Sequence, residues 1–232
     1  MSRWLITICW ILGSAFLTRL IPFSSFFRNV DTMIHEFGHA AATLLLSGRV
    51  LSMELNPDHS GVTYSTITAP WNIVPIAMAG YVSSSLFSLL MFYLYSRRNQ
   101  KLGLLLIMAI ALTTLLLFVH QGFGVRWLTG FILLTGVICF LGQGIQTFYY
   151  LLLCFLMLEE SVLGPVTIVA YAFLQPGEAG DATNLGRYTG IPGLVWALFF
   201  AVFALWCAKK ALGFFFRRSR AGRTYEYESY QG

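Results

Sequence analysis

Residues 32–50 read TMIHEFGHAAATLLLSGRV, and this stretch places His35, Glu36 and His39 at the start of an apolar helix. Positions i and i+4 lie on one face of a helix, so both imidazoles can present nitrogen atoms to one point. Nitrogen ligands suit Zn²⁺, and the intervening glutamate can reach water beside the ion without being a ligand itself. The stretch therefore predicts a metal site with His35 and His39 as ligands and Glu36 as general base.

The alternative for these residues is an ordinary structural role, as polar side chains at a helix entrance that are satisfied by hydrogen bonds. The chain has only four histidines, so the pattern arises by chance roughly 0.002 times in a chain of this composition. Ionisable residues inside a membrane are also costly and are usually functional. We therefore favour the metal site.

The composition is that of an integral membrane protein. The 232 residues are 57% hydrophobic and 11% charged, which is more apolar than a soluble domain of this size requires. We predict an all-α polytopic membrane protein, a bundle of about six to seven transmembrane helices with a small β-hairpin after the motif helix. The net charge of +5 comes from clusters that flank the apolar runs, as at helix ends in a lipid bilayer, so no nucleic-acid partner is expected.

Apolar runs bounded by charge, Gly or Pro predict where the chain crosses the membrane. We expect spans at about 4–22, 30–47, 71–95, 102–120, 126–141 and 190–212. We interpret the first as an uncleaved helix rather than a signal peptide. Residues 144–174 are apolar but interrupted by Glu159, Glu160 and Pro165, so they form either one kinked span or two half-helices.

The segment 49–68 alternates apolar and polar side chains on either side of NPDHSG. This is the pattern of a β-hairpin, in which Leu51, Met53 and Leu55 would share one face. Residues 175–190 are predicted to form a Gly-rich polar loop.

The predicted organisation is one membrane domain over residues 1–216, followed by a tail over residues 217–232. The tail is basic, then acidic and aromatic, and we expect it to be a mobile surface segment.

A catalytic zinc site takes a third protein ligand and keeps a fourth position for water. The chain offers few candidates for this ligand: Asp31, Asp58, His59, His120, Glu159, Glu160, Glu178 and Asp181. Asp181 is the best placed, because the glycines of GEAGDATNL let the backbone approach a metal and an apolar helix follows. A turn or helix-cap role is the alternative for Asp181.

The sequence HEFGHA, the turn ending at Gly48-Arg49-Val50 and the LSMEL strand together resemble the intramembrane metalloproteases of the site-2 protease family, peptidase family M50. The closest likeness is to its M50B-like bacterial branch. In that family a distant Asp completes the zinc site, and the matching residue is Asp181 in GDATNLGRYTGIPGLVW. The family's Leu-Asp-Gly signature and its Gly-Pro-x-x-Asn element are absent, and AGYVSSS at 79–85 stands in place of the second without the Asn.

The resemblance implies a zinc-dependent endopeptidase that cuts a peptide bond within or beside a membrane helix of a protein substrate. Zn²⁺ would be held by His35, His39 and Asp181, while Glu36 would carry a proton from water to the leaving amine. The substrate helix must unwind first. The hairpin edge at 50–68 either pairs with the unwound strand by β-augmentation or is a plain connection at the membrane surface.

Other interpretations stay open. A membrane zinc protease of another clan would use Glu159 or Glu160 as its third ligand. A membrane metal-binding scaffold or regulator would have lost turnover, although metal binding alone does not need Glu36. A transporter is less favoured, because we see no internal repeat. The sequence identifies no regulatory partner.

The resemblance places the protein in a bacterial cytoplasmic membrane with the hairpin on the cytosolic side. Arg97, Arg98 and Lys101, after the next helix, would then lie outside, against the positive-inside tendency. The basic segment that begins at Arg217 independently predicts a cytosolic C-terminus, and this is the only orientation that we adopt.

Overall fold

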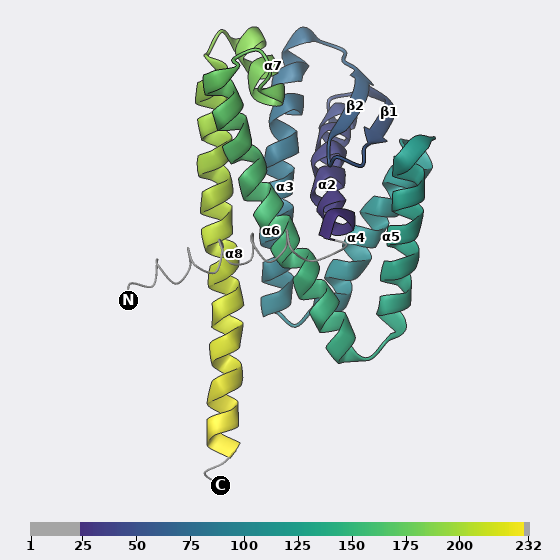
Figure 1. Cartoon of the computed structure of the whole chain (residues 1–232), viewed down its shortest axis with the longest axis vertical. Coiled ribbons are helices and arrows are strands. Elements are labelled where there is room, and N and C mark those ends of the chain that lie inside the picture. The colour runs from purple at the N-terminus through teal and green to yellow at the C-terminus, as the bar shows by residue number, and fades with distance from the viewer. Residues whose placement is uncertain (1–23, 230–232) are drawn as a thin grey trace.

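The computed structural model describes the backbone of residues 24–229 and the side chains of residues 26–217. The span predicted at 4–22 lies outside this part of the chain. The elements are α2 (Ser24–Leu45), β1 (Arg49–Leu55), β2 (Gly61–Thr66), a 3-10 helix (Pro70–Asn72), α3 (Ile73–Ser96), α4 (Gln100–Leu117), α5 (Gly122–Phe140), α6 (Gln143–Leu174), α7 (Gly180–Thr189) and α8 (Gly193–Ser229). Figure 1 shows a bundle of long helices with the hairpin and α7 at one end, while α8 extends beyond the other end.

Five helices of the described residues are long and apolar enough to cross a membrane: α3 with the 3-10 turn before it, α4, α5, α6 and α8. Large apolar side chains are exposed on their outer surfaces, as on helices that contact lipid. These features confirm the all-α polytopic class with a small hairpin. α2 is helical where the span at 30–47 was predicted, but it carries Arg28, Asp31 and Glu36 and is not among the five.

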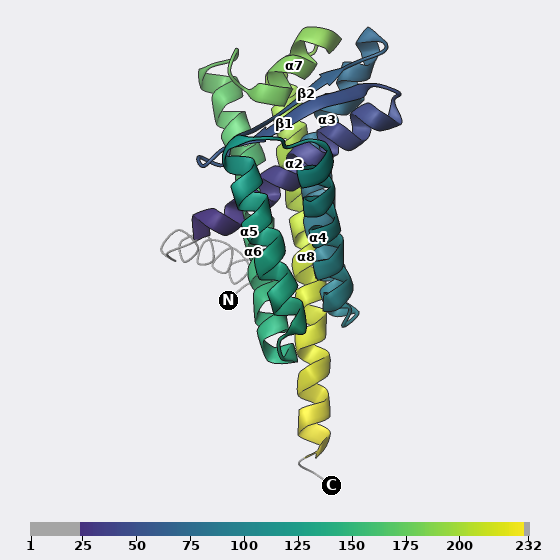
Figure 2. The same cartoon turned by 90° about the vertical axis from the view of Figure 1, so that its right-hand side faces the viewer.

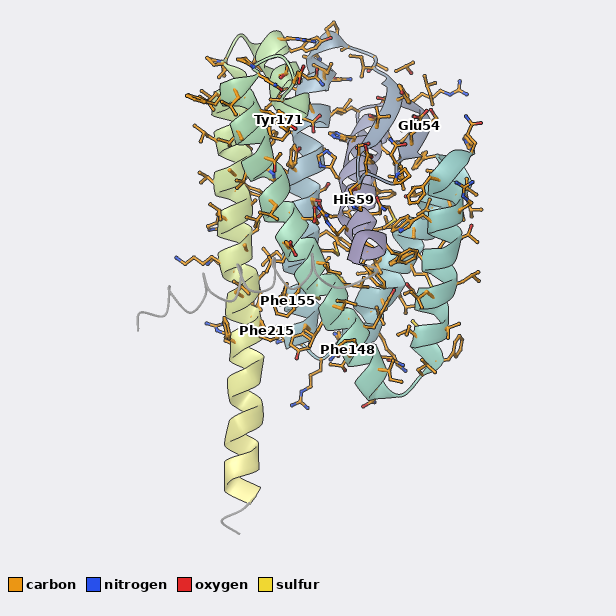
Figure 3. The ribbon with its side chains drawn as sticks, viewed as in Figure 1. Glu54, His59, Phe148, Phe155, Tyr171 and Phe215 are labelled. Atoms are coloured by element: carbon orange, nitrogen blue, oxygen red, sulfur yellow. The ribbon has the colours of Figure 1, made fainter. Side chains whose placement is uncertain are left out.

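The segment predicted as a kinked span or two half-helices is assigned as one helix, α6, with Pro165 inside it. α6 packs against α8, and their aromatic side chains meet at Phe155 and Phe215, whose ring centroids lie 5.1 Å apart (Figure 3). The backbone of α8 is helical through Ser229, so the predicted tail begins as a continuation of the last helix.

The hairpin forms as predicted, but one of its apolar residues leaves the common face. The pairing of β1 with β2 shifts between Val50 and Ser52, which indicates a β-bulge at Leu51. Met53 and Leu55 are 2% and 3% exposed, whereas Leu51 is 52% exposed. The prediction that all three share one face is therefore wrong, because the extra residue reverses the alternation before Met53.

The segment predicted as a Gly-rich loop contains a helix, α7. Ala182 and Leu185, one turn apart, are completely buried against the neighbouring helices. The helix ends at Gly190, which has a φ of 73° in the left-handed region, where glycine is favoured. Packing on one apolar face, rather than helix propensity, stabilises this short helix.

The motif helix α2 lies between the hairpin and α3 (Figure 2). Its contact with α3 is close because residue 38 is a glycine: a Cβ there would lie 2.8 Å from the carbonyl oxygen of Ala79 and would collide with the Ser83 side chain. This close approach brings the backbone of α3 beside the HExxH motif.

Candidate metal centre

His35 and His39 lie one turn apart on α2 and face each other. Their Nε2 atoms are 3.0 Å apart, and their ring planes form an angle of 78°. The Nδ1 atom of His39 lies 2.7 Å from the carbonyl oxygen of Ile76 on α3. Since a carbonyl only accepts, Nδ1 carries the proton and the lone pair of Nε2 points toward His35, as in histidine ligands held by an outer hydrogen bond.

Asp181, in the first turn of α7, reaches the same point from the far end of the chain. Its Oδ2 atom lies 3.2 Å from Nε2 of His35 and 3.3 Å from Nε2 of His39. Tetrahedral Zn²⁺ with ligands at about 2.0–2.1 Å would separate any two ligand atoms by about 3.3 Å. The three donor atoms therefore fit one zinc ion in both chemical type and spacing, and no other group of three or more such residues occurs in the described part of the chain.

Two residues of α3 form one wall of this centre. A Cβ at Gly80 would lie 2.5 Å from Nε2 of His35 and 2.5 Å from Nε2 of His39, so the absence of a side chain leaves space beside the donor atoms. The next residue, Tyr81, contacts His35 edge to face, with ring centroids 4.5 Å apart. From the sequence, their segment, 79–85, was identified only as the place of a family element that lacks its Asn, and the position of Gly80 and Tyr81 beside the histidines was not predicted.

Glu36 lies under the hairpin and is 5% exposed. The hydroxyl of Thr63 on β2 donates to Oε2 of Glu36 over 2.6 Å. A Cβ at Gly61 would lie 2.7 Å from Cγ of Glu36, so only glycine lets the strand rest on this side chain. The hairpin therefore holds the carboxylate next to the two histidines.

The other candidate ligands lie apart from the three donor atoms or have other partners. Asp31 accepts a hydrogen bond of 2.7 Å from Ser84, and Glu160 forms an ion pair with Arg28. Glu159 is buried but is not part of the cluster. The side chains of His120 and Glu178 are exposed.

Asp58 and His59 belong to the hairpin turn, which folds back onto α2. The carbonyl oxygen of His59 accepts a hydrogen bond of 2.9 Å from Thr32, and Figure 3 shows His59 beside α2. Burial and, after it, the Arg28 guanidinium lower the pKa of His59. Hydrogen bonds from the side chain and backbone of Ser60 lower the pKa of Asp58. Neither residue reaches the metal centre.

A bundle of apolar helices in which an HExxH helix meets a remote carboxylate defines the class of integral membrane metallopeptidases. A family model described as Peptidase M50B-like matches residues 4–211. The chain belongs to this family of peptidases, as its motif helix and hairpin indicated. Neither the curated proteins nor the solved structures contain a match to the chain.

Proposed function

We propose that the protein is a zinc-dependent intramembrane endopeptidase that cleaves a peptide bond within or beside a transmembrane segment of a membrane protein substrate. The observation that carries this proposal is the triangle of donor atoms from His35, His39 and Asp181 with Glu36 adjoining it. Zinc held there would supply a Lewis acid that polarises the scissile carbonyl and makes water more acidic.

Glu36 is the general base in this proposal. Its carboxylate accepts the proton of the attacking water and then delivers that proton to the leaving amine, so the glutamate is regenerated in each cycle. Thr63 donates to one carboxylate oxygen, which fixes the side chain and leaves Oε1 to accept the proton. A carboxylate held by a neighbouring strand is preorganised for this transfer.

The outer edge of β2 is the part of the hairpin that suits an unwound substrate strand. On β1, the amide of Met53 donates to the carbonyl of Phe118 over 2.8 Å, so that edge is partly occupied. Met53 and Thr63 lie opposite each other. Because the amide of Met53 points away from β2, the N–H and C=O of Thr63 point away from β1, toward the outer edge of β2. The sheet has only two strands in the described part of the chain, and β-augmentation along β2 would place the added strand close to Glu36.

Two alternatives are less well supported. A protease with Glu160 as third ligand would need that carboxylate to leave Arg28, whereas Asp181 already lies with the histidines. A scaffold or regulator without turnover would gain nothing from the hydrogen bond that holds Glu36 beside the site.

We further propose that the protein resides in a bacterial cytoplasmic membrane with its C-terminus in the cytosol. Its partners are then the lipid bilayer and a membrane protein substrate with a single span or signal-like helix.

The test is metal analysis of the purified full-length protein together with cleavage of candidate membrane substrates, for the wild type and Glu36→Gln. The variant should keep one zinc per chain, because Glu36 is not a ligand, and should lose at least about 100-fold in cleavage rate. Wild-type protein that binds no zinc would refute the metal centre, and equal cleavage by both forms would refute the role of Glu36.

A further inference from the structure

The path of the chain assigns each connection to one of two membrane faces. α3 leads away from the hairpin, and α4 returns to it, since Phe118 after α4 bonds to Met53 of β1. α5 leads away again, α6 returns to α7 and Asp181, and α8 leads away for the last time (Figure 1). The hairpin, the turn at 118–121 and α7 therefore share one face, which we call the metal-side face.

The opposite face carries the turns at 97–99 and 141–142 and the C-terminal end of α8. Arg98, Lys101 and Gln143 line a common polar pocket, which shows that these two turns are neighbours. One end of each of the five spans therefore lies at this opposite face.

Basic residues are concentrated on the face opposite the metal centre. Its flanking segments contain Arg97, Arg98, Lys101, Arg217, Arg218, Arg220 and Arg223, with acidic residues only at Glu226 and Glu228 near the chain end. The metal-side face mixes Arg49, Arg126 and Arg187 with Glu54, Asp58 and Glu178. Lysine and arginine close to the ends of spans accumulate on the cytosolic side, and acidic residues contribute little.

The metal centre itself lies near the metal-side face. The side chain of Thr63 on the hairpin touches Glu36 directly, and Asp181 belongs to the first turn of α7. The reacting groups therefore lie close below two elements that stand outside the five spans.

We infer that the metal centre opens toward the extracytoplasmic face of the membrane, opposite to the side that family resemblance implies for the hairpin. The consequence for the substrates rests on the proposed peptidase function. The substrates are then membrane proteins whose scissile bond lies at the extracytoplasmic end of their span. Cleavage releases the part of the substrate on that side and leaves its cytosolic part unchanged.

The test is the accessibility of single cysteines in the full-length protein to a membrane-impermeant maleimide. Serine replaces the cysteines at 9, 139, 154 and 207, and Glu54→Cys on the hairpin is compared with Asn99→Cys on the opposite turn. Both original side chains are exposed, and Figure 3 shows Glu54 on the hairpin. Glu54→Cys should react in intact cells, whereas Asn99→Cys should react only after the membrane is disrupted.

A second pair of exposed positions, Glu178→Cys and Gln143→Cys, repeats the comparison if either site of the first pair is shielded. Labelling of Asn99→Cys or Gln143→Cys in intact cells, alone or together with the metal-side cysteines, would overturn the inference. The readout needs neither zinc nor a substrate, so failure of the proposed function and failure of this orientation give different results.

Discussion

Substitution of Gly80 by alanine tests the metal centre without changing any ligand. The added Cβ would lie 2.5 Å from Nε2 of both His35 and His39, whereas unbonded heavy atoms approach to about 3.5 Å. The imidazoles must therefore retreat by about 1 Å. Metal sites tolerate deviations of about 0.2 Å in ligand distance, so we expect the donor triangle to break.

The magnitude follows from the cost of overpacking. Inserting a methyl group into a well-packed interior costs about 1–3 kcal/mol, which corresponds to an increase of about 5- to 150-fold in the Kd for zinc. Competition with a metal chelator measures this Kd on the purified full-length protein, and cleavage activity should fall in parallel.

Gly136→Ala is the matched control, because Gly136 is also within a helix but a Cβ there meets nothing within 4 Å. It should bind zinc as the wild type does, with a helix-propensity gain of up to about 1 kcal/mol. The thermal unfolding of both metal-free variants separates a folding defect from lost affinity. Wild-type zinc affinity in folded Gly80→Ala would refute the assignment of this space to the ion.

Three further predictions concern the groups around the centre and the hairpin turn. Thr63→Val should keep zinc but lower kcat about 10-fold, since about 1.4 kcal/mol of hydrogen bonding to Glu36 is lost. Thr63→Ser keeps the hydroxyl and should restore most of the activity. An unchanged kcat in Thr63→Val would contradict the role of Thr63 in holding Glu36. Asp181→Asn should lose zinc, whereas Glu160→Gln should keep it. Glu160→Gln should lower the unfolding free energy by about 1–3 kcal/mol, because the partly buried Arg28 guanidinium loses its charged hydrogen-bond partner. The reverse pattern in metal analysis would move the third ligand to α6. Because the pKa of His59 is lowered in the fold, the undocked hairpin binds a proton first as pH falls, so amide hydrogen exchange in residues 56–63 should rise below about pH 6.5. His59→Asn tolerates the positive φ of this position and should weaken this pH dependence; an undiminished dependence would assign it to another group.

The motif helix and the hairpin could be predicted because their signals are local. The spacing of His35 and His39 defines one helix face, and period-two alternation defines the strands. The bulge at Leu51 could not be predicted, because an unpaired residue changes the register only relative to a partner strand.

Asp181 was predicted as a candidate from its glycines and from family resemblance, but its structural setting was predicted as a loop. The sequence GDATNLGRYT has two glycines and few apolar residues, so local propensity argues against a helix. Its stability comes from Leu185 and Ala182, which are buried against other helices. Tertiary packing of this kind is not visible in a single segment, so the reach of Asp181 toward α2 could not be predicted either.

The feature least visible in the sequence is the free space around the candidate ligands. The chain has 21 glycines, and three of them determine the centre's geometry for different reasons. Gly38 lets α3 approach α2, Gly61 lets the hairpin rest on Glu36, and Gly80 leaves room next to both imidazoles. Each of these contacts is between α2 and a segment more than 20 residues later in the chain. A ligand set read from a sequence therefore identifies which atoms can bind a metal, whereas the space that the metal needs is determined by how closely the other elements approach α2.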